Sequence, residues 1–330
     1  MTSIHDVAAL AQVSIKTVSR VVNKAPNVSD ELRQRVKLAI EQLGYRPNQS
    51  ARRLAGGRSF MIAFLYNNPA PGYVSRIQIG AAWRCRELGY HLVVEPISLG
   101  GEERFEVLER LVAALRPDGV LLVPPLSDDP GLLQRLADMG LPCARIAGSE
   151  EGAGFNIHTP EHAAGRTMAD HLIGLGHRRI GVITPPPTHT AALRRVTGFR
   201  EGMAAAGLAE DAGLFVEGRF DFASGVEAGE ALLKRSDPPT AIFATNDEMA
   251  LGVLTLAHRV GLRVPEELSV TGFDDTTASL TSWPPLTTMR QPLEDMGRTV
   301  IDALADGLKQ TPPLQFTLVR RGSSGPAPGR

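Results

Sequence analysis

Seven short apolar runs alternate with longer stretches of helical periodicity from residue 59 onward. Each run is the length of one buried strand, and the stretches between are long enough for helices that connect parallel strands. Sheets of this kind bind ligands outside the carboxyl ends of their strands. We therefore predict an α/β fold with about 270 residues in it, enough for two lobes with a cleft between them. The runs are FMIAFLY, YHLVVEP, GVLLVPP, PCARIA, RIGVIT, TAIFATN and LSVTGFD, and the helical stretches include 77–88, 161–175, 191–206 and 247–260.

The first sixty residues show a different pattern, that of three short amphipathic helices. Ser3, Ser14 and Ser29 each precede a helical pattern and are suited to cap its first turn. Three helices in about 45 residues, the first two joined by a tight turn at Gln12, predict a helix-turn-helix unit. Their expected buried faces are Ile4, Val7, Ala8 and Ala11; Val18, Val21 and Val22; and Leu32, Val36, Ile40 and Leu43, with Gly44 ending the third helix.

The charge of the chain is unevenly distributed. Residues 1–60 hold ten Lys or Arg and four Asp or Glu, a net of +6, whereas the whole chain has a net charge of −1. In the second helix, Ile15, Lys16 and Arg20 face away from the valines, and residues 13–24 contain no acid to neutralise them. Lys and Arg can donate to guanine, and Ile can pack on a thymine methyl group. This face is typical of a helix that lies against DNA.

A short basic segment follows the third helix. In YRPNQSARRLAGGRS, residues 45–59, Pro47 ends the preceding helix and residues 48–55 can form two helical turns before a glycine pair. A helix this short is not stable alone in water, where about 12–15 residues are needed. A basic helix that folds only when something holds it would act as a switch.

The chain resembles the lactose-repressor family of bacterial transcription regulators through nearly its whole length. The resemblance rests on DVAALAQVSIKTVSRVVN, then VS, LGYRPN and ARRLA, and further on LGHRRIGVI, ATNDEMALG and GFDD. In that family the second helix enters the major groove, and a hinge helix enters the minor groove beside its dimer mate, where a leucine opens the central base step. The implied DNA-binding residues are Ser14, Ile15, Lys16, Thr17, Ser19, Arg20, Asn23, Ala51, Arg53 and Leu54, with Leu54 as the wedge.

The resemblance also implies how the rest of the chain is organised. Two Rossmann-like lobes of periplasmic-binding-protein type are expected, with the chain crossing between them three times. The expected parts are a helix-turn-helix domain at 1–46, a hinge at 47–58, a two-lobe effector-binding and dimerisation domain at 59–319 and a disordered tail at 323–330. Within the two-lobe domain the N-lobe takes about 59–160 and 291–313, and the C-lobe about 161–290 and 314–322.

Six residues at strand ends and in the loops that follow them form the expected effector site. Arg, Asn and Asp side chains together can make paired hydrogen bonds to vicinal hydroxyls, and an aromatic ring can cover the C–H face of a sugar. As a set, these residues match positions that bind the effector in the family. They are Asn68, Tyr73, Arg195, Phe220, Asn246 and Asp274, with Phe222 as an alternative to Phe220.

Three positions depart from what the resemblance or the local pattern leads us to expect. The family usually has Gly where this chain has Gln12, and if that position needs a positive φ, Gln costs about 1 kcal/mol. Many relatives place an Asp where Ala147 stands. Arg145 lies inside an apolar strand, where an unpaired charge is costly. We interpret it as part of an ion pair at a lobe surface or dimer interface, in preference to a contact with an anion such as an acidic sugar's carboxylate.

Motifs of other function classes are absent or weak. The chain has no GxGxxG after the first strand, no Walker A motif and no GxSxG. His158, Glu161 and His162 match the HxxEH zinc signature, but Pro160 disfavours the single helix that this signature requires. We expect no catalytic residue, metal or cofactor. Cys85 and Cys143 are distant and predict free thiols in a reducing cytoplasm. No apolar run is long enough to span a membrane, and the N-terminus does not resemble a secretory signal.

These observations predict a cytoplasmic, homodimeric DNA-binding regulator. We expect a repressor of a carbohydrate-utilisation operon that binds a pseudo-palindromic operator and is released by a sugar-type inducer. The alternative is a repressor that needs a corepressor such as a purine. An exported sugar-binding protein would lack residues 1–58, and a Rossmann-type enzyme would need a phosphate-binding fingerprint. No leucine heptads follow LQFTLVRRGSSGPAPGR, so a dimer is expected rather than a tetramer.

Overall fold

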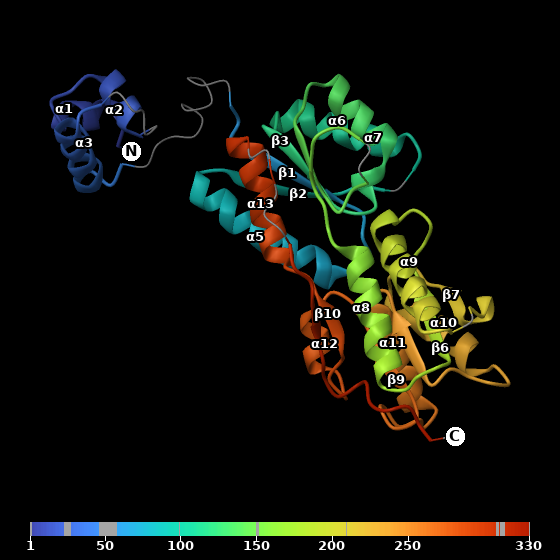
Figure 1. The fold of residues 1–330 in the computed structure, drawn as a ribbon. Helices are drawn as coiled ribbons and strands as arrows, with labels where there is room; N and C mark the ends of the chain where they lie inside the picture. Colours follow the sequence, from blue (N-terminus) through green and yellow to red (C-terminus); the bar gives the residue numbers. More distant parts are fainter. Residues whose placement is uncertain are drawn as a thin grey trace. The chain divides into compact units, whose positions relative to one another are not determined.

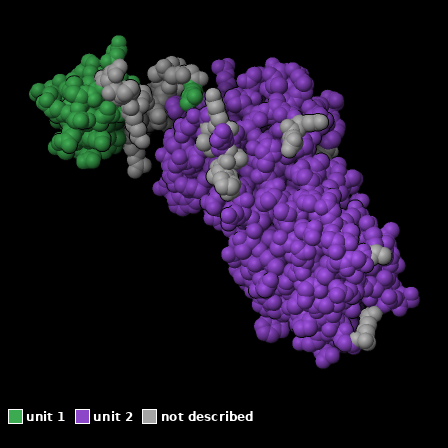
Figure 2. All heavy atoms as spheres, in the orientation of Figure 1, with its two compact units in different colours: residues 1–59 green, residues 60–330 purple. Residues whose placement is uncertain are grey.

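The computed structural model divides the chain into two compact units, residues 1–59 and residues 60–330, which Figure 2 colours separately. It describes residues 2–22, 28–45, 58–98, 100–149, 152–208, 210–307, 310 and 314–329. Figure 1 shows the elements of both units, and each unit is described by itself.

Unit 1 is a bundle of three helices, α1 (Ile4–Leu10), α2 (Ile15–Val22) and α3 (Asp30–Gln42). Ser3 and Asp6 form a capping box at the start of α1, and the hydroxyls of Ser14 and Ser29 accept backbone N–H groups at the starts of α2 and α3. Val7, Val18 and Val36, one from each helix, are fully buried at the centre. The predicted helix-turn-helix unit is confirmed.

The turn between α1 and α2 contains a strained residue. Gln12 has a φ of 52°, in the region that a residue with a side chain adopts at a cost. Gln12→Gly should therefore raise the free energy of unfolding of unit 1 by about 1 kcal/mol. Hydrogen exchange of the Val18 amide in the full-length protein measures this change. Slower exchange in the variant is expected, and an unchanged or faster rate would count against a strained turn.

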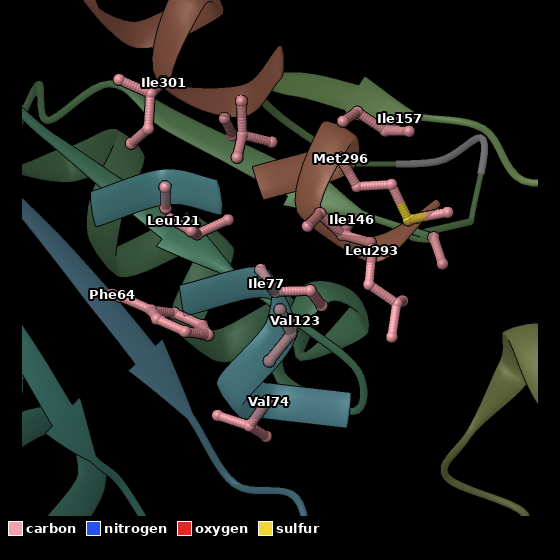
Figure 3. Packing of buried hydrophobic residues seen from close by; sticks show 14 of the residues in the cluster. Phe64, Val74, Ile77, Leu121, Val123, Ile146, Ile157, Leu293, Met296 and Ile301 are labelled. Carbon is pink, nitrogen blue, oxygen red and sulfur yellow. The ribbon is translucent and has the colours of Figure 1, made fainter. Parts of the chain in front are cut away.

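The N-lobe of unit 2 is a five-stranded parallel sheet in the order β2-β1-β3-β4-β5. Helices α5 and α13 cover one face, where Figure 3 shows their side chains packing on the strands, and α6 and α7 cover the other. The strands are β1 (Met61–Tyr66), β2 (His91–Pro96), β3 (Gly119–Leu122), β4 (Cys143–Ile146) and β5 (Phe155–Ile157). The helices are α5 (Pro71–Leu88), α6 (Glu103–Leu115), α7 (Pro130–Asp138) and α13 (Leu293–Asp306), with a 3-10 turn at Leu126–Asp128.

The C-lobe has a four-stranded parallel sheet in the order β7-β6-β8-β9. Its strands are β6 (Ile180–Thr184), β7 (Phe215–Glu217), β8 (Ala241–Ala244) and β9 (Ser269–Thr271). Its helices are α8 (Glu161–Gly174), α9 (Thr190–Ala205), α10 (Phe222–Leu233), α11 (Asp247–Arg259) and α12 (Thr277–Thr281), with a 3-10 turn at Ala212–Leu214. A separate antiparallel pair joins β10 (Thr288–Arg290) to β11 (Thr317–Val319). Within the described ranges, no helix has the length and apolar character needed to cross a membrane.

Glycines let the two helices of a pair approach closely in both lobes. A Cβ atom on Gly165 of α8 would lie 1.9 Å from the backbone oxygen of Arg195 in α9, and one on Gly198 of α9 would lie 1.9 Å from that of His162. Helices α5 and α13 meet in the same way, because a Cβ on Gly80 would lie 1.9 Å from the backbone oxygen of Glu294. Backbone therefore packs directly on backbone in both helix pairs.

The C-terminal residues lie along the outer edge of the C-lobe sheet. The expectation of a disordered tail at 323–330 is wrong for residues 323–329. The Val270 amide in β9 donates to the backbone oxygen of Ser323 at 2.8 Å, and the Gly325 amide donates to Ser269 Oγ at 3.0 Å. The segment is held by hydrogen bonds to an edge strand, which small and polar residues make as well as apolar ones. Composition alone could not reveal this.

Ser323 is the most tightly held residue of this segment. Its fully buried hydroxyl donates to the backbone oxygen of Val270 at 2.6 Å and accepts the Thr287 amide at 2.8 Å. Ser323→Ala leaves both backbone groups without this partner, so we expect the free energy of unfolding to fall by about 1–3 kcal/mol. Urea denaturation measures the change. Ser75→Ala, at an exposed hydroxyl on α5, is the control, and equal effects of the two substitutions would contradict the prediction.

Candidate functional site

Helix α2 presents the predicted DNA-contacting side chains on its outer face. Val18 and Val21 are buried, whereas Ile15, Lys16 and Arg20 are exposed. Neither Lys16 nor Arg20 forms an ion pair with any residue of the described ranges. The hydroxyl of Ser14 caps the helix by accepting the Thr17 amide at 3.1 Å, and Thr17 and Ser19 are half-buried. A basic, unneutralised helix face of this kind can bind phosphates and base edges.

The other predicted DNA contacts lie outside the described residues. These are Asn23, Ala51, Arg53 and Leu54, together with the hinge helix expected at 48–55.

A small pocket, with a cavity volume of about 30 Å³, lies where loops that follow strands of the two lobes meet. Five of the six predicted effector-site residues line it: Asn68, Tyr73, Arg195, Phe220 and Asp274. Parallel strands bring their carboxyl ends to one edge of each sheet, which is why residues far apart in the sequence meet here.

The N-lobe supplies Asn68 and Tyr73 to this pocket. Asn68 follows β1, and its Nδ2 donates to the backbone oxygen of Pro124 at 3.2 Å while its Oδ1 accepts the Ala70 amide at 2.9 Å. These bonds fix the loop that leads into α5. Tyr73, in the first turn of α5, is buried, and this burial raises the pKa of its hydroxyl, which stays protonated.

Arg195 of α9 is the central cation of the pocket. Its Nε donates to Glu161 Oε2 at 2.8 Å, and its Nη1 donates to the backbone oxygen of Thr245 at 2.5 Å. The guanidinium lies over the ring of Phe273, 3.7 Å from its centre, which adds a cation–π contact. Arg195 is 5% exposed and Glu161 is 1% exposed, so the charge pair is removed from bulk water.

Asp274 enters the pocket from the loop after β9. Its Oδ1 accepts a hydrogen bond from Gln291 Nε2 at 2.6 Å. Burial raises the pKa of Asp274 well above its ordinary value. Asp247 lies behind it, and burial raises the pKa of Asp247 to about 7 although two threonines donate hydrogen bonds to its carboxylate.

Asn246 does not line the pocket, which differs from the sequence-based expectation. It caps α11, where its Oδ1 accepts the Met249 amide at 3.0 Å, and its Nδ2 donates to the backbone oxygen of Phe220 at 2.9 Å. Both ends of the amide are therefore used to hold the loop that carries Phe220. Between the two aromatic alternatives, Phe220 is the one that lines the pocket, because Phe222 is 43% exposed at the start of α10.

The pocket concentrates strained backbone. Ala147, Phe220 and Asp274 all line it, and their φ angles are 54°, 62° and 120°. Non-glycine residues in this region cost about 1–3 kcal/mol each, and such residues cluster at binding sites. The walls of the pocket are therefore shaped partly by backbone conformations that the surrounding fold must maintain.

Glu161 and His189 also line the pocket, although neither is among the six residues predicted for the effector site. In the sequence, Glu161 stood out only as part of the HxxEH motif. The side chains of that motif do not point to one site, because Glu161 pairs with Arg195 while His162 pairs with Glu201. The Nε2 atom of His189 is buried with no hydrogen-bond partner among the described residues. Burial, with the nearby charge of Arg195, lowers the pKa of His189 to about 4, so the ring is neutral at pH 7.

Arg145 lies outside the pocket lining, in the N-lobe. Its Nη1 donates to the backbone oxygen of Ser127 at 3.1 Å and lies 3.9 Å from Asp128 Oδ1, and its Nη2 donates to the backbone oxygen of Gly152 at 3.2 Å. These contacts bind two of the three guanidinium nitrogens, Nη1 and Nη2, to groups of the same lobe. They support an ion pair over a ligand contact, but the expected place at a lobe surface or dimer interface is wrong, because Arg145 is 1% exposed inside the N-lobe.

Two hydrogen bonds join the lobes beside the pocket. Thr190 Oγ1, at the start of α9, donates to the Asp128 carboxylate in the N-lobe. Arg194 Nη2 donates to the backbone oxygen of Ala147 at 3.2 Å. Helix α9 therefore contacts the opposite lobe through the residues that flank Arg195, so a ligand at Arg195 lies at the junction of the two lobes.

Comparison with known proteins gives a consistent result. Residues 3–48 match a family model described as bacterial regulatory proteins, lacI family, and residues 169–324 match one described as a periplasmic binding protein-like domain. The HTH-type transcriptional regulator CelR of Thermobifida fusca is 37% identical over 94% of this chain and 94% of its own length. A solved CelR–cellobiose complex is 33% identical and superposes with a TM-score of 0.72, covering 98% of this chain and 100% of that one. The solved Lac repressor dimer bound to operator and the anti-inducer ONPF is 31% identical to this chain. It superposes with a TM-score of 0.79, covering 98% of this chain and 99% of that one.

Proposed function

Because the chain belongs to the lacI family of bacterial regulatory proteins, we propose that it represses carbohydrate-utilisation genes and leaves its operator when a small sugar-type effector binds. The main support for a sugar-type effector is the pocket at the junction of the lobes, which Arg195, Asp274 and Phe220 line. Charged hydrogen-bonding groups beside an aromatic ring suit a molecule with hydroxyls on its edges and C–H groups on a face.

The proposed binding to operator DNA is supported by the outer face of α2. Lys16 and Arg20 are exposed on a helix-turn-helix unit and have no ion-pair partner among the described residues. The solved Lac repressor relative is a dimer bound to operator. We propose that this chain also acts as a homodimer, on a pseudo-palindromic operator in the cytoplasm, because two symmetric helix-turn-helix units need two symmetric half-sites. We assign it no enzymatic reaction.

The coupling between the two halves is proposed to run through the lobe junction and the segment 47–58. An effector bound at Arg195 would alter the contacts that α9 makes with Asp128 and Ala147 in the N-lobe. The angle between lobes would change, and with it the spacing of the two hinge segments of a dimer. Coupling of this kind is typically about 1–3 kcal/mol. A corepressor such as a purine is the alternative effector, and it would strengthen operator binding instead of weakening it.

Base-specific contacts by α2 give the first test of this function. Lys16→Ala and Arg20→Ala should each reduce discrimination between operator and random DNA by about 1–3 kcal/mol if the side chain donates to guanine. Fluorescence anisotropy with the two DNAs at one salt concentration measures the ratio. Lys37→Ala, which removes an exposed lysine from α3, is the matched control and should leave the ratio unchanged. Equal loss of affinity for both DNAs would assign Lys16 and Arg20 to phosphates only.

A further inference from the structure

Glu161 is a buried carboxylate in the pocket wall with one oxygen committed to the protein. Oε2 accepts a hydrogen bond from Arg195 Nε at 2.8 Å. The other oxygen, Oε1, accepts no hydrogen bond from the described residues, although the side chain is 1% exposed. Glu161 lines the pocket, so this oxygen can be reached from it. The unused oxygen of Glu161 is therefore suited to accept a donor group from a ligand.

Arg195 has a matching unused donor. Its Nε is bound to Glu161 and its Nη1 to the backbone oxygen of Thr245, whereas Nη2 has no acceptor in the described ranges. A carboxylate and a guanidinium that each keep one free position can together bind two neighbouring hydroxyls, one as donor and one as acceptor.

The charged groups that line the pocket leave no cation for an anionic ligand. The positive charge of Arg195 is already paired with Glu161, and His189 is neutral at pH 7 because burial lowers its pKa to about 4. Asp274 adds a carboxyl group with a raised pKa, so the lining carries a net charge of zero or −1. A second buried arginine, Arg145, is not part of the lining.

An anionic ligand would therefore lose its hydration without gaining an unpaired positive charge, and it would lie close to Glu161 and Asp274. Both effects are costly in a site with little water. An uncharged polyol avoids the like-charge repulsion and satisfies the free positions of the Glu161–Arg195 pair. The buried and unpartnered Nε2 of His189 provides one more hydrogen-bonding position for such a ligand.

We propose that Glu161 contacts the effector directly, and that the Glu161–Arg195 pair restricts this pocket to uncharged, hydroxyl-rich ligands. This inference rests on the proposed function, because it concerns the chemistry of the same effector site. It assigns to Glu161 a role in specificity beyond that of holding Arg195 in place.

The test compares uncharged sugars with their anionic derivatives. Isothermal titration calorimetry of the full-length protein would use glucose, galactose, ribose and cellobiose, with the matching sugar phosphates and sugar acids. The wild-type protein should bind at least one uncharged sugar, and its anionic derivatives should bind more than about 100-fold more weakly. The pH is kept at 7.5, where the neutral form of His189 dominates.

Two variants separate direct contact from a structural role. Glu161→Gln keeps the shape but leaves Arg195 without its counter-charge, so affinity for the uncharged sugar should fall roughly 10–100-fold and preference should shift toward the anionic derivative. Glu201→Gln is the control, because Glu201 lies on the neighbouring helix, half-exposed and paired with His162. If Glu161 only holds Arg195 in place, Glu161→Gln lowers the melting temperature and affinity for all ligands but keeps their order.

Each result decides one claim. A wild-type preference for an anionic sugar, or an unchanged preference in Glu161→Gln, overturns the inference. Binding of none of the uncharged sugars, with specific operator binding intact, also overturns it but leaves the DNA-binding function standing. Failure of the wild-type protein to distinguish operator from random DNA would instead refute the proposed function.

Discussion

Arg195→Ala is expected to abolish the effect of the effector on operator binding and to lower the free energy of unfolding by about 3–5 kcal/mol. The substitution leaves the Glu161 carboxylate buried without its counter-charge and removes a donor to the Thr245 carbonyl oxygen. It also empties the position over the Phe273 ring. Operator binding in the absence of effector should persist, because residues 1–59 form a unit separate from the one that contains Arg195.

Two further variants make this prediction specific. Arg200→Ala removes an arginine from the same helix that is exposed and paired with Glu210, so it should change stability by about 0.5 kcal/mol or less. The double variant Glu161→Ala/Arg195→Ala removes both buried charges and should recover part of the lost stability without recovering the response to effector. Urea denaturation and anisotropy titration measure the two properties. A normal effector response in Arg195→Ala would remove Arg195 from the effector site.

Gly165→Ala is expected to be destabilising by about 3 kcal/mol, and to weaken effector binding as well. The added Cβ would lie 1.9 Å from the backbone oxygen of Arg195, so α8 and α9 must move apart. Glu161 lies one turn before Gly165, and Arg195 lies one turn before Gly198, so a shift between the helices also separates the charge pair. Thermal unfolding and calorimetric titration with the effector measure the two effects.

Helix α8 contains its own control. Gly174, at the end of the helix, has no neighbouring atom within 4 Å of an added Cβ. Gly174→Ala should raise the free energy of unfolding by about 0.5–1 kcal/mol, because alanine favours the helix more than glycine. Opposite signs for the two substitutions are the expected outcome. Similar stability changes in both variants would show that the close approach at Gly165 is not what limits the helix pair.

The strands that the sequence predicts are those that lie within an apolar run longer than the strand itself. All seven runs from FMIAFLY to LSVTGFD lie on observed strands. The strands that were missed, β5, β7, β10 and β11, have three residues each, and none of the seven apolar runs covers them. Ser323 was assigned to a disordered tail for a related reason, because its hydrogen bond to Val270 in β9 depends on a partner 53 residues earlier.

The sequence predicts those residues of the candidate site that directly follow a strand, and it predicts the others less well. Asn68 and Asp274 come directly after apolar runs, so parallel-sheet topology brings them to one edge. Glu161 follows no predicted strand, and its importance comes from Arg195, which is 34 residues away in the sequence. Asn246 was assigned to the pocket because it follows β8. Its side chain instead caps the N-terminus of α11 by accepting the Met249 amide.

The route of the chain through the two lobes has a consequence for how the protein is made on the ribosome. The N-lobe core includes side chains of α13, and the edge of the C-lobe sheet at β9 is paired with Thr287 and with residues 323–325. Neither lobe can complete its native contacts before residues 293–329 have left the ribosome exit tunnel, although residues 2–45 contain the whole helix-turn-helix core. Nascent chains should therefore carry a folded N-terminal unit followed by an exposed sheet edge, the kind of surface that chaperones protect from aggregation.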